Sequence, residues 1–67
     1  MNTKALGARI AKLREQRGLS QGALARLAKV HRITVLRLES GLLTNPSVDT
    51  LLAIAKALKV RLVVDFR

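Results

Sequence analysis

The sequence predicts a small all-α domain of four helices, followed by a short C-terminal strand. In four stretches of residues 4–58, apolar residues recur at three- and four-residue spacing, which is the period of a buried helical face. In residues 60–67 apolar residues instead occupy every second position, which is the period of a strand. The chain has 67 residues, so we expect one helical domain over residues 1–59 and a separate strand over residues 60–67.

The first helix is predicted over about residues 4–17. Its apolar stripe consists of Leu6, Ile10 and Leu13. Thr3 is a candidate cap, and Gly18 is the type of residue that closes a helix. Gly7 is unfavourable inside a helix and indicates close packing against a neighbouring element.

Two short helices joined by a tight turn are predicted over residues 21–28 and 32–40. Their apolar positions are Leu24, Ala25, Ala28, Val35 and Leu38, with Val30 in the turn. Ser20 is placed to cap the first helix, and Gly41 is placed to end the second in a left-handed conformation. A short helix held across another helix fits the major groove of DNA, so this stretch predicts a helix-turn-helix.

A fourth helix is predicted over about residues 48–58, after a loop over residues 41–46 and a cap at Ser47. It should close the core over the other three helices. Its apolar stripe consists of Leu51, Leu52, Ile54, Ala55 and Leu58.

The C-terminal strand is predicted to pair across a homodimer. Its alternating apolar residues are Val60, Leu62, Val64 and Phe66. No second strand is predicted elsewhere in the chain, and an unpaired strand needs a partner from another chain.

The net charge of +9 favours a polyanionic partner, because most of the 13 Lys and Arg residues precede Glu39. One alternative explanation of the positive charge is solubility alone. Another is binding to an anionic membrane surface, although the capped and tightly turned segment argues against membrane binding. Phe66 is the single aromatic residue, so stacking platforms for single strands are missing and double-stranded DNA is favoured. No apolar run approaches the roughly 20 residues of a membrane span, so we expect a cytoplasmic, nucleoid-associated protein.

The central stretch resembles the Cro/cI-type helix-turn-helix family. The run Leu-Ser-Gln-Gly-Ala-Leu-Ala over residues 19–25 carries this resemblance, together with Asn-Pro-Ser over residues 45–47. Further matching positions are Val30, Thr34, Val35, Arg37, Leu38, Glu39 and Gly41. The resemblance covers about residues 6–60 and implies a lambda-repressor-like fold. Lys29 stands where the family has a turn glycine, which implies a positive φ or a different turn.

Arg32, Ile33 and Arg37 are the candidate base-reading residues, because arginine can bond two guanine acceptors and Ile33 can contact a thymine methyl group. The alternative is that these side chains are merely solvated. Candidate backbone-contacting or capping residues are Gln21, His31, Thr34, Ser40 and Asn45. The resemblance supports a phosphate contact for Gln21, whereas turn and cap roles suit Ser40 and Asn45 equally well.

The resemblance also implies that Arg14 and Glu39 form a partly buried ion pair. Four leucines fall at positions expected to be exposed, and they form either a patch for a protein partner or scattered surface residues. These are Leu27, Leu36, Leu42 and Leu43.

No catalytic constellation, cofactor motif or metal-ligand cluster is visible, so we expect neither catalysis nor a cofactor. The strand after four helices resembles HipB-like antitoxins, which implies an autoregulating repressor with a toxin partner. The alternatives are a stand-alone phage or plasmid-type repressor, a restriction controller, or a protein-interaction module that bridges partners.

Overall fold

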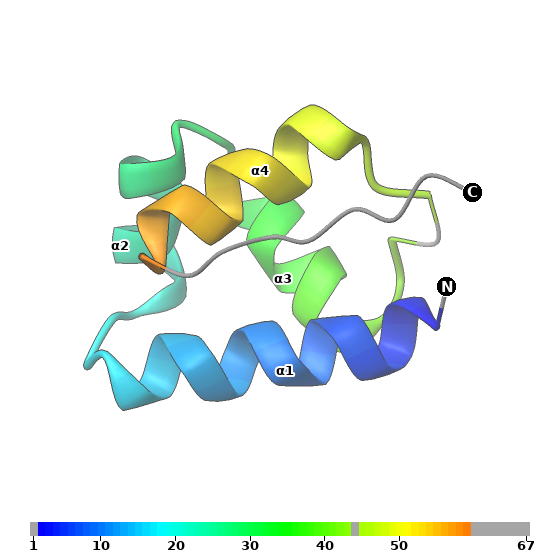
Figure 1. The fold of residues 1–67 in the computed structure, drawn as a ribbon, viewed down its shortest axis with the longest axis horizontal. Helices are drawn as coiled ribbons and strands as arrows, with labels where there is room; N and C mark the ends of the chain where they lie inside the picture. Colours follow the sequence, from blue (N-terminus) through cyan, green and yellow to red (C-terminus); the bar gives the residue numbers. More distant parts are fainter. Residues whose placement is uncertain (1, 44, 60–67) are drawn as a thin grey trace.

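The computed structural model describes residues 2–43 and 45–59, which form four helices (Figure 1). They are α1 (Thr3–Gln16), α2 (Gln21–Ala28), α3 (Arg32–Ser40) and α4 (Val48–Ala57). The predicted four-helix fold is confirmed, and the described residues contain no strand. The strand and dimer contacts predicted for Val60, Leu62, Val64 and Phe66 lie outside the described residues.

Short polar side chains cap three of the helices. The Oγ atoms of Ser20 and Ser47 accept hydrogen bonds from backbone amides three residues later, at 3.0 and 3.1 Å, as predicted. The prediction for α1 was wrong, because Asn2 is its cap and Thr3 already lies inside the helix. Asn2 Oδ1 accepts a 3.1 Å hydrogen bond from the Ala5 amide, and asparagine caps helices at least as well as threonine.

The core lies where α1, α2, α3 and α4 meet. Its largest fully buried side chains are Leu24, Val35, Leu38, Ile54 and Leu58, and Ile10 of α1 is also buried. Two predictions about burial were wrong. Leu52 is 46% exposed, because it lies at the edge of a stripe whose centre is Ile54 and Leu58. Leu43 packs against the core, because its amide donates to the Arg37 carbonyl (3.1 Å) and so folds the loop back over α3.

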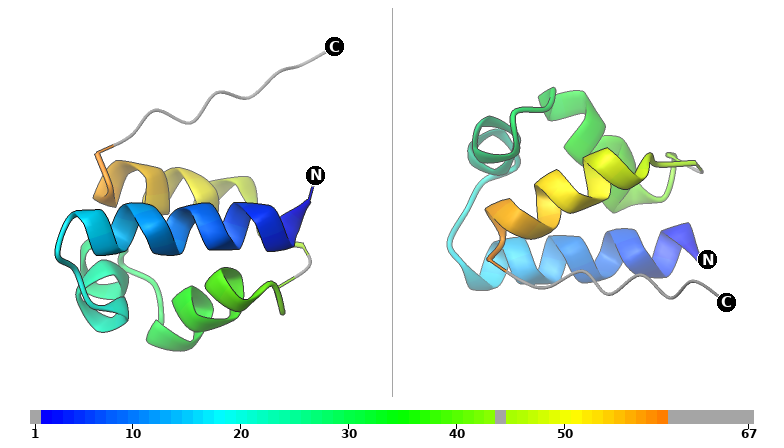
Figure 2. Two further views of the ribbon diagram at one scale, coloured as in Figure 1. Left: turned by 90° about the horizontal axis from the view of Figure 1, so that it is seen from below. Right: turned by 45° about the horizontal axis from the view of Figure 1, so that its top comes forward.

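Among the described helices, α3 and α4 are not closely packed on one another. α1 packs on α3, and α2 packs on both α3 and α4. The left view of Figure 2 shows α3 and α4 on either side of α1. The outer face of α3 is therefore not covered by another described element. None of the described helices has the length and apolar character needed to cross a bilayer.

Candidate nucleic-acid interface

The turn between α2 and α3 fixes the two helices across one another. Lys29 ends α2 in the left-handed region, with φ 58° and ψ 42°, so the positive φ implied by its glycine-like position is present. The next amide, of Val30, donates a 3.0 Å hydrogen bond back to the Ala25 carbonyl. Val30 packs its side chain against the core and thereby anchors the turn. The chain then enters α3 through His31, whose side chain makes no capping hydrogen bond.

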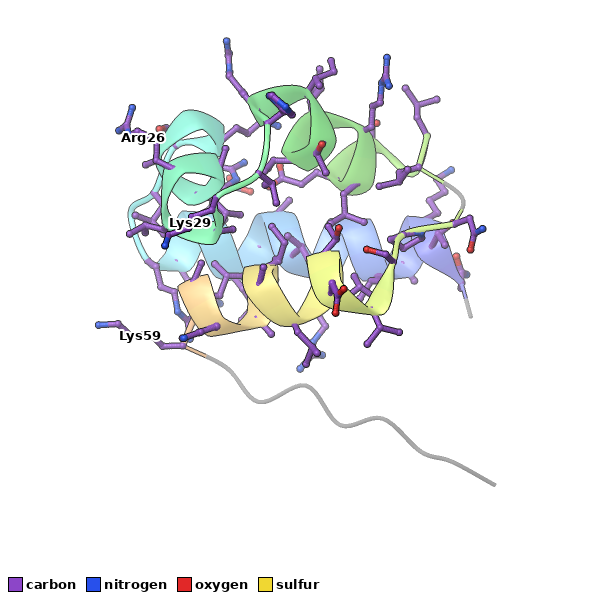
Figure 3. The ribbon with its side chains drawn as sticks, turned by 90° about the horizontal axis from the view of Figure 1, so that it is seen from above. Arg26, Lys29 and Lys59 are labelled. Carbon is purple, nitrogen blue, oxygen red and sulfur yellow. The ribbon has the colours of Figure 1, made fainter. Side chains whose placement is uncertain are left out.

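The outer face of α3 is cationic and apolar. Val35 and Leu38 are buried on the inner face, and this leaves Arg32, Ile33 and Arg37 exposed. Leu36 is exposed at helical spacing from Arg32 and Ile33, so it shares their face. Figure 3 shows nitrogen-tipped side chains that project from α3 away from α4. The spacing of Leu36 from Ile33 was the signal in the sequence that would have placed it on this face.

The carboxylate of α3, Glu39, points away from this face and into a hydrogen-bonded network. Arg14 Nε donates to Glu39 Oε2 at 2.6 Å, and Arg14 Nη2 donates to Oε1 at 3.0 Å. The two side chains are only 14% and 7% exposed, so the pair is largely shielded from water. The hydrogen bond to Glu39 is the largest cause that raises the pKa of Arg14 above its usual value. The paired charges expected from the sequence thus join α1 to α3.

Gln21 belongs to the same network. Its Nε2 donates to Glu39 Oε1 at 3.0 Å, so the side chain connects the start of α2 with α3. Arg14 Nη1 also donates to the carbonyl of Leu19 at 2.8 Å and holds the loop that leads into α2. The side-chain amide of Gln21 is therefore held in place within the protein itself. Sequence reasoning missed this contact because it requires knowing how α2 and α3 cross.

Two glycines allow α1 to approach α3 closely. A Cβ atom at Gly7 would overlap the carbonyl oxygen of Leu38 and lie 3.0 Å from that of Glu39. At the other end of the contact, Gly41 ends α3 with φ 80° and lies against Lys4 of α1. The close packing expected at Gly7 is confirmed, and it fixes the position of α3 on the bundle.

The remaining candidate residues lie at the edges of the α3 face. His31 and Asn45 are exposed, and Thr34 is half-buried. Ser40 is exposed, and its hydroxyl donates to the Arg37 carbonyl at 3.2 Å, which is the structural role weighed for it. The described residues contain no group of His, Cys, Asp and Glu side chains able to hold a metal ion.

Comparisons with known proteins agree on the class of domain. A helix-turn-helix family model matches residues 10–64. Among solved structures, the chain is similar to the restriction-modification controller protein C.AhdI from Aeromonas hydrophila. The two are 36% identical with a TM-score of 0.85, and the match covers 88% of each chain. No curated protein sequence matches this chain.

Proposed function

The chain belongs to the helix-turn-helix family of DNA-binding transcription regulators, and we propose that it is a sequence-specific repressor that binds double-stranded DNA through α3. The observation that carries this proposal is the composition of the outer face of α3. Arg32 and Arg37 are exposed there, while Glu39 of the same helix is held inside by Arg14. A helix with this surface can enter the major groove without a carboxylate facing the phosphates.

In this proposal Arg32, Ile33 and Arg37 contact base edges. Arginine can donate two hydrogen bonds to guanine, and the branched side chain of Ile33 suits a thymine methyl group. Leu36 shares this face and adds apolar contact area. The proposed backbone contacts come from Gln21, His31, Thr34, Ser40 and Asn45. Gln21 is the strongest of these, because it lies at the positive N-terminus of α2 and the network holds its side chain in place.

The experiment that tests the proposal is selection of binding sites from a library of random duplexes. The protein is expected to enrich one short sequence, and the same selection with an Arg32→Ala, Arg37→Ala double variant should lose the enrichment. If the parent protein enriched no sequence, it would not discriminate between DNA sequences and the proposal would be wrong.

We propose that the functional unit is a homodimer, with the two α3 helices in major-groove half-sites about one helical turn apart. The apolar alternation of residues 60–67 supports an intermolecular strand pair, with 1–59 as the DNA-binding domain. In this arrangement the strands of the two chains satisfy each other's backbone hydrogen bonds.

Likeness to C.AhdI favours a restriction-modification controller over the autoregulating antitoxin that the tail suggests. The two roles make different partners necessary. A controller needs DNA and a second copy, whereas an antitoxin also needs a toxin. Purification of the tagged protein from its host, followed by mass spectrometry, separates them. A stoichiometric toxin encoded beside this gene would establish the antitoxin role. Recovery of the chain alone, with its selected site lying before restriction-modification genes, would establish the controller role.

A further inference from the structure

An open groove lies between α2 and α4, at the end of the molecule where α1 leads into α2. Its volume is about 820 Å³, within the roughly 300–1,000 Å³ typical of binding pockets. The floor is apolar, and Leu27 in it is 58% exposed. The floor residues are Leu19, Leu27, Ala28, Ala53 and Ala57. None of the described residues that line the groove belongs to α3, so the groove is separate from the outer face of that helix.

The rim of the groove is cationic. The charged residues that line it are Arg17, Lys29, Lys56 and Lys59. No carboxylate is among the described residues that line the groove. Figure 3 shows Lys29 and Lys59 at the same end of the molecule, whereas Arg26 projects from the side of α2 away from α4.

Backbone conformation sets two of these lysines apart. Lys29 and Lys59 are the two non-glycine residues with positive φ among the described residues, at 58° and 57°. Glycine would adopt these angles without the steric penalty of a Cβ atom. Lys29 is the C-cap of α2, Lys59 directly follows the C-cap of α4, and both line the groove. Two positions at which the backbone conformation favours glycine are therefore occupied by lysine.

We propose that this groove binds an acidic amphipathic helix of a partner protein while α3 is on DNA. An apolar stripe on the partner would cover the floor, and flanking Asp or Glu side chains would meet the lysines of the rim. A DNA backbone would pair with the cations but leave Leu27 in water. A purely apolar helix would cover Leu27 but would offer the cations of the rim no opposite charge.

The test uses the full chain and a fluorescein-labelled synthetic peptide about four helical turns long. This peptide has leucine at helical spacing and glutamate at the flanking positions. One control peptide has the same composition in scrambled order, and another has lysine in place of glutamate. Only the acidic amphipathic peptide should bind, and binding should persist when the protein is first saturated with duplex DNA. Equal binding of the scrambled peptide, displacement by DNA, or no binding of the acidic peptide would overturn the proposal.

Two matched variants localise the peptide. Lys29→Gly should weaken peptide binding about three- to fivefold, whereas Arg26→Ala removes an equal charge outside the groove and should change it less than twofold. Lys29→Gly should melt no lower than the parent, because glycine relieves the left-handed residue, so the loss would not come from unfolding. Equal losses for the two variants would contradict the proposed site.

The groove floor is tested separately with Leu27→Glu, which places a carboxylate among the apolar residues. It should weaken the acidic peptide about tenfold or more and leave the DNA affinity for the selected site within about twofold. The molecular mass by light scattering should equal that of the parent. A loss of self-association in this variant would assign the groove to a second copy of the chain and overturn the proposal.

Discussion

Glu39 decides which groups α3 presents to its surroundings. Its side chain is 7% exposed and accepts hydrogen bonds from both Arg14 and Gln21, so three helices meet at one carboxylate. A buried ion pair contributes little net stability when desolvation is counted, but removing one partner leaves the other charge unpaired. We therefore assign this pair mainly to orienting α3 and α2.

The first prediction concerns this carboxylate. Glu39→Ala should lower the free energy of unfolding by about 2–4 kcal/mol, and more than the Arg14→Ala, Glu39→Ala double variant, because the single change strands the Arg14 charge. Urea melts of the two single variants and the double variant give the coupling energy. Glu15→Ala, which removes an exposed carboxylate from α1, should change stability by no more than about 0.5 kcal/mol. Strictly additive effects of Arg14→Ala and Glu39→Ala would show that the pair is uncoupled.

At the scale of the elements, local signals predicted α2 and α3 with their observed bounds. Ser20 and Gly41 mark the ends of the motif through side-chain capping and a left-handed conformation, and neither depends on distant residues. The burial of Leu43 and the hydrogen bond from Gln21 to Glu39 were not predicted. The first depends on how the loop after α3 folds back, and the second on how α2 and α3 cross. The base-reading roles remain predictions, since they require a complex with DNA.

A second prediction tests the contact between α1 and α3. Gly7→Ala should destabilise the protein by about 1–3 kcal/mol, although alanine favours helix, because its Cβ would overlap the Leu38 carbonyl. Gly22→Ala is the matched control. Around Gly22 the nearest atom to a new Cβ lies 3.9 Å away, so the change should be neutral or stabilising by up to about 1 kcal/mol. Thermal melts followed by circular dichroism compare the two. A shift of the same sign in both variants would contradict the close packing at Gly7.

For the whole molecule, the net charge and the proposed self-association are expected to determine how DNA is bound. The net charge of +9 should make the affinity fall steeply with salt as counterions are released. A chain of 67 residues buries on folding only about 60% of the surface that the unfolded chain exposes. Dimerisation is one way in which small domains bury more apolar surface. The proposed strand pair over residues 60–67 would supply this additional buried surface.

The third prediction is that deletion of residues 62–67 gives monomers, lowers the melting temperature and abolishes cooperative binding to a two-half-site operator. The alternation of the tail provides a matched pair of point variants. Val64→Asp charges the proposed apolar face and should dissociate the dimer, whereas Val63→Asp charges the opposite face and should not. Light scattering at tens of micromolar protein is the measurement. A full-length monomer at that concentration would refute the dimer, and an unchanged dimer after deletion would place the interface elsewhere.

The most direct test of base reading by α3 is a titration of the selected site and a scrambled duplex with the parent, Arg37→Ala and Arg9→Ala proteins. Arg37→Ala should lose about 1–3 kcal/mol of binding free energy on the selected site and much less on the scrambled duplex, because only the selected site offers the guanine that it reads. Arg9→Ala removes an exposed cation from α1 and should weaken both duplexes equally. Equal losses on both duplexes for Arg37→Ala would show that this arginine contributes charge alone, and that α3 does not read the sequence through it.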